Sequence, residues 1–338
     1  MRDTPLGWAA GNGHAEVVKI LLGHGDIDPN KPGSGGQTPL LWAAWKGHGE
    51  VVKLLLGRDD IDPNKPGSDG QTPLLWATRN RHEGVVKLLL GRDDVDPNKP
   101  SEDGQTPLNS AVCNGYTGVV KLLLGRDDVD PNKPGDRGQT PLTWAALEGN
   151  EGVVKLLLGR DDVNPNKPDK HSRTPLLWAA WHGHSGVVEL LLKQGNVEPD
   201  KPAPDGKTPL WWASRQGHKG LVKILLRQDD VNPDKPNKHG ETPLNCAARR
   251  GNEGVVELLL GRNGVNPNKQ DDKGRTPLWR AARNGHEGVV KLLLGWEGID
   301  PGKPNEHGET PLWRATKNGH TSVIALLQPL TSTTHSAP

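Results

Sequence analysis

Phenylalanine is absent from this sequence of 338 residues, tyrosine and methionine occur once each, and cysteine occurs twice. The core is therefore expected not to depend on aromatic packing, although the chain carries 12 tryptophans. An excess of one charge is also lacking, because 42 Lys and Arg residues balance 41 Asp and Glu residues and leave a net charge of +1. Such a chain has no overall field that would draw it onto nucleic acid or an anionic membrane. Any electrostatic preference has to be local.

What the sequence has instead is a period. The tripeptide Thr-Pro-Leu recurs every 34 residues without insertion or deletion, beginning at Thr4, Thr38, Thr72, Thr106, Thr140, Thr174, Thr208, Thr242, Thr276 and Thr310. Positions are numbered below by their offset from each of these threonines. The period predicts one repeat array over residues 1–328. Pro329 is expected to end its last helix and to leave residues 329–338 as a disordered tail.

The two cysteines, Cys113 and Cys246, fall in the fourth and eighth repeats. At about 8–10 Å per stacked repeat, no disulfide can join them. The sequence also has no Asn-x-Ser/Thr site, no apolar run long enough to cross a bilayer and no leader ahead of Thr4. These absences predict an intracellular protein without membrane contact. The cytoplasm is the expected location, with the nucleus as the alternative.

Each repeat predicts two short helices. Threonine is a good N-cap and proline suits the first helical position, so each Thr-Pro opens a first helix. Glycine at offset 9, present in nine repeats, ends that helix. A second helix follows through the Val-Val-Lys-Leu-Leu-Leu segment, and the Asp-Pro-Asn-Lys-Pro stretch breaks it. We expect an antiparallel pair with a projecting turn, extended as a β-hairpin finger, which is stable only when stacked on its neighbours.

The repeated pattern TPLxWAAxxGHxxVVKLLL resembles the ankyrin repeat over residues 1 to about 328. The resemblance implies an all-α repeat solenoid with projecting fingers, in which first helices and fingers line a groove that contacts protein partners. It implies a non-catalytic interaction scaffold. Two features depart from the family pattern: the histidine that usually follows Thr-Pro-Leu is absent from all ten repeats, and the period is one residue longer than usual. The hydrogen bonds normally made by that histidine are therefore in question.

Tryptophan is concentrated on the first helix, where eleven of the 12 occupy offset 3, 4 or 7. At offset 4 we expect the ring to wedge between adjacent repeats. At offsets 3 and 7 we expect it to contact a partner, because tryptophan is enriched at binding hot spots. The predicted contact residues of this kind are Trp45, Trp181, Trp211, Trp279 and Trp313.

Charge on the first helices is uneven. Offsets 3, 4, 7 and 8 of the last four repeats hold seven cations and no acid, namely Arg215, Arg249, Arg250, Arg280, Arg283, Arg314 and Lys317. Three of them follow a tryptophan by one turn, a spacing that predicts cation–π contacts. We therefore expect an extended, acidic peptide or protein segment as the partner, and single-stranded nucleic acid as the less favoured alternative. Neutral variation of solvent-exposed charges is the other interpretation of this pattern.

Other motifs are explained by the repeat itself. Asp60, Asp62 and Asn64 resemble the start of a calcium loop, but its glycine and its last glutamate are missing. Lysine at offset 27 is expected to serve turn structure and charge balance, and histidine at offset 10 to be structural. No Ser-His-Asp, Cys-His or paired-carboxylate arrangement stands apart from the repeat pattern. No enzyme activity, cofactor or metal is therefore expected.

The first repeat has no polar cap that would cover Leu6 and Trp8. Two interpretations follow. The array is a part of a longer protein, such as the recognition region of an intracellular receptor, or its open face stacks head-to-tail on another copy. We expect a monomeric binding module and keep self-association as the alternative.

Overall fold

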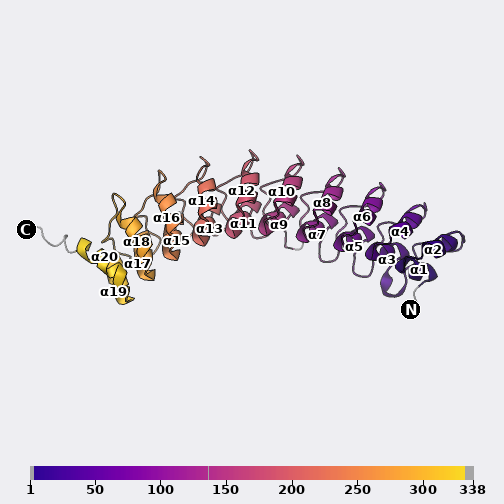
Figure 1. Ribbon diagram of the computed structural model, residues 1–338, viewed down its shortest axis with the longest axis horizontal. Helices are drawn as coiled ribbons and strands as arrows, with labels where there is room; N and C mark the ends of the chain where they lie inside the picture. The colour runs from indigo at the N-terminus through magenta and orange to yellow at the C-terminus, as the bar shows by residue number, and fades with distance from the viewer. Residues whose placement is uncertain (1–3, 136, 332–338) are drawn as a thin grey trace, which may run out of the picture. The chain divides into compact units, whose positions relative to one another are not determined.

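The computed structural model describes residues 4–135 and 137–331. Two compact units divide the chain: an N-terminal unit, Met1–Lys170, and a C-terminal unit, His171–Pro338. Within each unit the described residues form successive pairs of short helices without any β-strand (Figure 1). The predicted all-α repeat solenoid is confirmed.

The helices of the N-terminal unit are α1 (Pro5–Gly11), α2 (Ala15–Leu22), α3 (Pro39–Lys46), α4 (Gly49–Leu56), α5 (Pro73–Arg79), α6 (Glu83–Leu90), α7 (Pro107–Cys113), α8 (Thr117–Leu124), α9 (Pro141–Glu148) and α10 (Glu151–Leu158), with a short 3-10 helix, η1 (Ser34–Gly36). Those of the C-terminal unit are α11 (Pro175–His182), α12 (Ser185–Leu192), α13 (Pro209–Gln216), α14 (Lys219–Leu225), α15 (Pro243–Arg250), α16 (Glu253–Leu260), α17 (Pro277–Asn284), α18 (Glu287–Leu294), α19 (Pro311–Lys317) and α20 (Thr321–Thr331).

The helices of each unit stack in two rows. Odd-numbered helices pack on odd-numbered ones and form the first-helix row, and even-numbered helices form the second-helix row in the same way (Figure 1). In the N-terminal unit the core between them is aliphatic, since Leu74, Ala77, Val86 and Leu89 are at most 1% exposed. In the C-terminal unit the core also contains Trp211 and Trp212, so the expectation of a core without aromatic packing is wrong there. Over the described residues, no helix combines the length and the apolar character that crossing a bilayer needs.

The predicted ends of the first helices are confirmed, but the second helices end earlier than predicted, as α4 does at Leu56, before the Asp-Pro-Asn-Lys-Pro stretch that begins at Asp62. In all ten repeats the threonine hydroxyl caps the first helix, as where Thr38 Oγ1 accepts the N–H of Leu41 at 3.2 Å. Glycine at offset 9 adopts the left-handed conformation, with φ of +78° at Gly47. A Cβ on Gly47 would also lie only 2.7 Å from the ring of His82 in the next repeat. His82 Nε2 lies 3.0 Å from the carbonyl oxygen of Trp45, so histidine at offset 10 has the predicted structural role.

The third repeat breaks this rule at Arg81, which replaces the glycine and keeps a left-handed φ of 58°. A side chain in this region costs about 1–2 kcal/mol. The neighbouring repeat changes in step, because it carries Tyr116 in place of histidine. The guanidinium of Arg81 lies over the Tyr116 ring, 5.7 Å from its centre.

The connections after the second helices differ from the expected β-hairpins. They are successions of turns in the described residues, closed by bonds such as that from the Gly67 N–H to the Gln71 oxygen at 3.0 Å. Pro63 and Pro66 explain the difference, because proline has no N–H to donate to a β-ladder.

Asparagine at offset 26 joins successive connections of the N-terminal unit to one another. Asn64 Oδ1 accepts the N–H of Asp96 at 2.8 Å, and Asn64 Nδ2 donates to the Asp94 oxygen at 2.6 Å. Lys99 Nζ donates to the Asn64 carbonyl at 3.1 Å. The same bonds recur along the N-terminal unit. Lysine at offset 27 therefore stabilises the turns as predicted, by donating a hydrogen bond to a backbone carbonyl of the preceding connection. The predicted charge balance with the nearby acid is not seen at Lys99, because no ion pair joins it to Asp96 in the described residues.

Aspartate replaces this asparagine in two consecutive repeats, as Asp200 and Asp234. Each carboxylate has one buried oxygen, Oδ1, without a hydrogen-bond partner among the described residues. An asparagine amide could donate to the neighbouring carbonyl from this position, whereas a carboxylate oxygen can only accept. Burial raises the pKa of both carboxyls, although the charge of Lys235 beside Asp200 and of Lys269 near Asp234 acts against the shift.

The end of the array corrects one expectation. Helix α20 does not stop at Pro329 but continues to Thr331. The proline lies in the last turn, where its missing N–H removes only one helical hydrogen bond. The predicted disordered tail is therefore wrong for residues 329–331, and its remainder, residues 332–338, lies outside the described residues.

We expect Asp234→Asn to raise the free energy of unfolding at neutral pH by about 1 kcal/mol, the net value of one hydrogen bond. Because the pKa of Asp234 is raised in the folded state, the cost of the carboxylate is present above that pKa and is relieved as the pH falls below it. The gain should therefore shrink in acid. Urea denaturation followed by tryptophan fluorescence measures both effects. Asn98→Asp, the reverse change, should destabilise the chain; equal stability of the Asp234→Asn variant and the parent would contradict the explanation.

Candidate functional site

The first-helix row carries aromatic side chains at its surface in both units. In the N-terminal unit, Trp45 lies between Trp42 and Trp76, with ring centres 5.0 and 5.3 Å away. Trp45 is half-buried, and Lys46 Nζ lies 4.5 Å from its ring. The predicted contact residue Trp45 thus belongs to a small aromatic cluster and is only partly accessible to solvent.

The C-terminal unit holds a longer aromatic stack. Trp181 stacks on Trp178 at 5.3 Å and on Trp212 at 3.9 Å, with interplanar angles of 6° and 12°. Trp178 and Trp212 are buried, as expected for offset-4 rings wedged between repeats, whereas Trp181 at offset 7 is half-buried. The expectation is not met at the other offset-4 rings, because Trp42, Trp76 and Trp144 are half-buried and Trp8 is 57% exposed. Guanidinium groups lie over the outer rings, with Arg173 4.1 Å from Trp178 and Arg215 5.1 Å from Trp212. Trp181 is the member of this stack that keeps contact with solvent.

The prediction of surface contact is wrong for two of the tryptophans, because they are buried. Trp211 and Trp279, both at offset 3, are only 2% and 1% exposed. This side of the first helix faces the next repeat, so the ring is covered by it. Each indole N–H donates to a backbone carbonyl of its own connection, Trp211 to Glu241 at 3.2 Å and Trp279 to Glu309 at 3.0 Å. Trp313 is 43% exposed at the same offset because no further repeat packs on it among the described residues.

Polar residues at offset 3 therefore take over the bonding left by the missing histidine. Asn245 Nδ2 donates to the carbonyls of Lys269 and Arg275, each at 3.1 Å. Asn109 Nδ2 donates to the Lys133 carbonyl at 2.9 Å. In these repeats, as in those with tryptophan, the first helix is tied to its own connection.

Acidic side chains missed by the sequence analysis neutralise part of the cationic surface. Glu241 Oε1 lies 3.3 Å from Arg249 Nε and 3.5 Å from Arg280, contacts that are ion pairs without hydrogen-bond geometry. Arg314 pairs with Glu309 at 3.8 Å. These acids come from offset 33, which is Gln, Arg or Lys in other repeats. The sequence could have indicated these ion pairs, because Glu241 and Glu309 directly precede first helices that carry arginine.

Arg280 is corrected from a partner contact to a structural residue. Its side chain is 8% exposed and is bonded to Asp271, which also accepts from Arg275 at 2.9 Å. Burial lowers the pKa of Arg280, but a guanidinium stays protonated in proteins. For Asp271, burial acts to raise the pKa, yet the backbone N–H of Arg275 and the charges of Arg280 and Arg275 lower it overall. The pair is a buried ionic link between a first helix and the connection before it.

Four predicted cations keep an accessible position: Arg250, Arg283 and Lys317 are exposed and Arg215 is half-buried. None of the four forms an ion pair within the described residues. The expected cation–π contacts are present, at 5.9 Å between Arg215 and Trp211, 5.8 Å between Arg283 and Trp279, and 4.5 Å between Lys317 and Trp313. We call Trp181, Trp313 and these four cations the first-helix face of the C-terminal unit.

The groups that could have supported chemistry are engaged elsewhere. Asp60 binds Arg58 through both oxygens at 2.8 and 2.7 Å, and Asp62 accepts the N–H of Asn64. Burial raises the pKa of both thiols, Cys113 and Cys246, to about 12, which keeps them protonated at neutral pH. In the part of the chain that the structure describes, no three His, Cys, Asp or Glu side chains are grouped to hold a metal.

Comparison with known families agrees with this architecture. A model that describes three ankyrin repeats matches residues 1–67, 59–134, 127–202, 195–271 and 254–334. The chain belongs to the ankyrin repeat family. Ankyrin repeats are generally protein–protein interaction modules and typically non-enzymatic. Among curated proteins, no relative matches this ankyrin chain.

We expect Asp271→Asn to lower the free energy of unfolding by about 3 kcal/mol at neutral pH, because it leaves the buried Arg280 without its main partner. The loss should diminish in strong acid. The pKa of Asp271 is lowered in the folded state, so its contribution is lost as the pH falls through that value. Chemical denaturation measures the change. As a control, Asp272→Asn removes an adjacent exposed carboxylate and should change the free energy of unfolding very little. Similar losses from both variants would contradict the claim that the buried pair of Asp271 and Arg280 stabilises the fold.

Proposed function

We propose that this ankyrin protein is a non-catalytic scaffold whose first-helix face in the C-terminal unit binds an extended acidic segment of a protein partner. The observation that carries the proposal is the series Arg215, Arg250, Arg283 and Lys317. It places one cation without an ion pair on each of four successive, stacked first helices. The cations that acids already neutralise, Arg249, Arg280 and Arg314, have a structural role in this scheme.

The spacing of this series suits an extended peptide. Stacked helices lie about 8–10 Å apart. A chain in the extended polyproline II conformation has three residues per turn and advances about 3.1 Å per residue, so acidic residues at every third position would lie on one face and keep step with the repeats. Trp181 and Trp313, on helices α11 and α19, offer aromatic surface at the two ends of the series. Aromatic anchors beside arginine are the composition of binding hot spots.

A protein partner fits better than single-stranded nucleic acid. Binding of unpaired bases relies on a succession of accessible aromatic rings. Trp211, Trp212 and Trp279 are buried, which leaves Trp181 and Trp313 as the accessible rings of this face. Carboxylates, by contrast, need only the charge and the donors that the arginines supply.

Head-to-tail self-association is a second candidate. It is favoured by the apolar side chains of the first repeat, where Trp8, Val17 and Ile20 are 57%, 44% and 63% exposed. Light scattering over a range of protein concentrations tests it, and a mass that stays monomeric throughout would remove it.

The binding proposal is tested with fluorescein-labelled peptides carrying glutamate at every third position, titrated with the full chain and followed by fluorescence anisotropy. Arg250→Glu combined with Arg283→Glu should weaken binding at least about tenfold, because two attractive contacts become repulsive. Added salt should weaken binding to the parent chain. Lys193→Glu with Arg262→Glu changes the net charge equally at exposed sites away from this face and serves as the control. Equal affinities for the parent and the first double variant would refute the proposal.

A further inference from the structure

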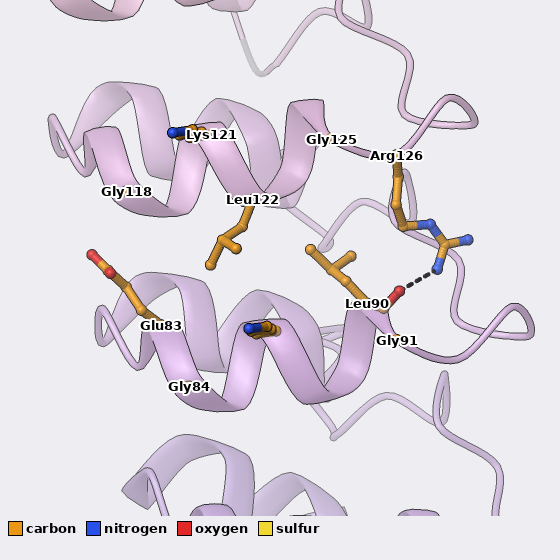
Figure 2. A pocket seen from close by; sticks show the side chains of 10 residues that line it. Glu83, Gly84, Leu90, Gly91, Gly118, Lys121, Leu122, Gly125 and Arg126 are labelled. Carbon is orange, nitrogen blue, oxygen red and sulfur yellow. Dashed lines mark hydrogen bonds between the residues drawn. The ribbon is translucent and has the colours of Figure 1, made fainter.

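A second candidate binding surface lies on the second-helix row of the N-terminal unit. Helices α6 and α8 run side by side there, and a groove of about 740 Å³ opens between them (Figure 2). The side chains of Leu90 and Leu122 point into it from the two helices. Lys87 and Lys121 line the same groove, and both are exposed. The groove thus combines an apolar floor with one lysine from each helix.

The ends of the groove are chemically different. Glu83 lies at one end, beside Gly118 of the opposite helix (Figure 2). At the other end Arg126 donates to the Leu90 carbonyl at 3.2 Å and is neutralised by Asp128. The accessible charge of the groove is therefore two lysines against one glutamate.

The two lysines belong to a row that runs through the whole N-terminal unit. Every repeat there has lysine at offset 15, exposed and without an ion pair in the described residues, namely Lys19, Lys53, Lys87, Lys121 and Lys155. The C-terminal unit does not continue the row. Glu189 and Glu257 replace two of its lysines, and Lys291 is paired with Glu287 at 2.6 Å. A cation in this position is therefore not required by the fold.

The spacing of the row identifies a class of partner. Adjacent helices of the stack are about 8–10 Å apart. An α-helix rises 1.5 Å per residue, so residues seven apart lie on one face about 10.5 Å from each other. The residues three and four positions on lie between them on the same face. A helix with acids at positions i and i+7 and apolar residues at i+3 and i+4 would match the lysines with its acids and the leucine floor with its apolar side chains.

We propose that the groove between α6 and α8 is a docking site for an acidic amphipathic helix of a partner protein. The helix crosses the second-helix row, with carboxylates seven residues apart on Lys87 and Lys121 and apolar side chains on Leu90 and Leu122. Its edge over Glu83 is neutral or basic. This site is separate from the first-helix face and does not depend on the function proposed for that face.

Gly84 provides a way to close the groove without disturbing the fold. A Cβ added at Gly84 would meet no heavy atom within 4 Å. The same holds for Gly220, the corresponding glycine of a repeat in the C-terminal unit. Gly84→Trp should therefore fill the groove, and Gly220→Trp is its matched control.

The probe is a labelled synthetic helix with glutamate at heptad positions i and i+7 and leucine at i+3 and i+4, titrated with the full chain by fluorescence anisotropy. We expect Gly84→Trp, and separately Lys87→Glu with Lys121→Glu, to weaken its binding at least about tenfold. Gly220→Trp and Lys223→Glu should leave the affinity unchanged. A peptide of the same composition with its acids five residues apart should bind at least about tenfold more weakly, because these acids no longer share one helical face.

The variant Arg250→Glu with Arg283→Glu separates this site from the first-helix face, and it should not alter binding of the helical probe. If that variant abolishes binding while Gly84→Trp does not, the probe binds the other surface and the docking site is refuted. Unchanged affinity in the Lys87→Glu, Lys121→Glu variant, with circular dichroism like that of the parent, refutes it as well.

Discussion

The structure depends on contacts that a single repeat cannot make by itself. A unit of 34 residues has to order its backbone at a cost of about 1–2 kcal/mol per residue, and two helices of seven or eight residues bury too little apolar surface to offset it. The polar contacts show the same dependence. His82 reaches the carbonyl of Trp45, and Asn64 reaches the backbone of Asp94, each in a neighbouring repeat. Helix ends and turns are therefore completed by the next copy along the chain.

This constraint also sets the spacing of the surfaces. Once neighbouring repeats are fixed in register by glycine, histidine and asparagine, any side chain that points to solvent recurs at the helix-packing distance. Arg283 and Lys317 are repeated in this way on first helices, and Lys87 and Lys121 on second helices. Regular spacing of charge follows from the stack. The stack does not fix the sign of the charge at each position. Lys121 and Glu257 occupy the same position in different repeats, and both lie in intact helices.

The features predicted well from the sequence are those decided within a few residues. Thr38 as a cap and Gly47 as a left-handed end follow from local backbone chemistry. The burial of Trp211 does not. Offsets 3 and 4 differ by only about 100° around the helix, and both can face a neighbour in a stack, so only the packed structure separates them. The pairing of Glu241 with Arg249 was missed because the acid comes from a turn and the arginine from the following helix, positions with unrelated periodicity.

Some departures from the common repeat are accommodated by a contact with the next copy, and such departures have a structural explanation. Arg81 in place of glycine accompanies Tyr116 in place of histidine, and the two side chains stack. Asp200 in place of asparagine is approached by Lys235 Nζ at 2.9 Å. In both cases the contact lies 35 residues further on, but only Tyr116 is itself a change, because every complete connection carries a lysine at the position of Lys235. Lys87 has no such partner among the described residues. Within the described residues no ion pair explains this lysine, which is the reason that the docking site proposed above assigns its charge to a partner helix.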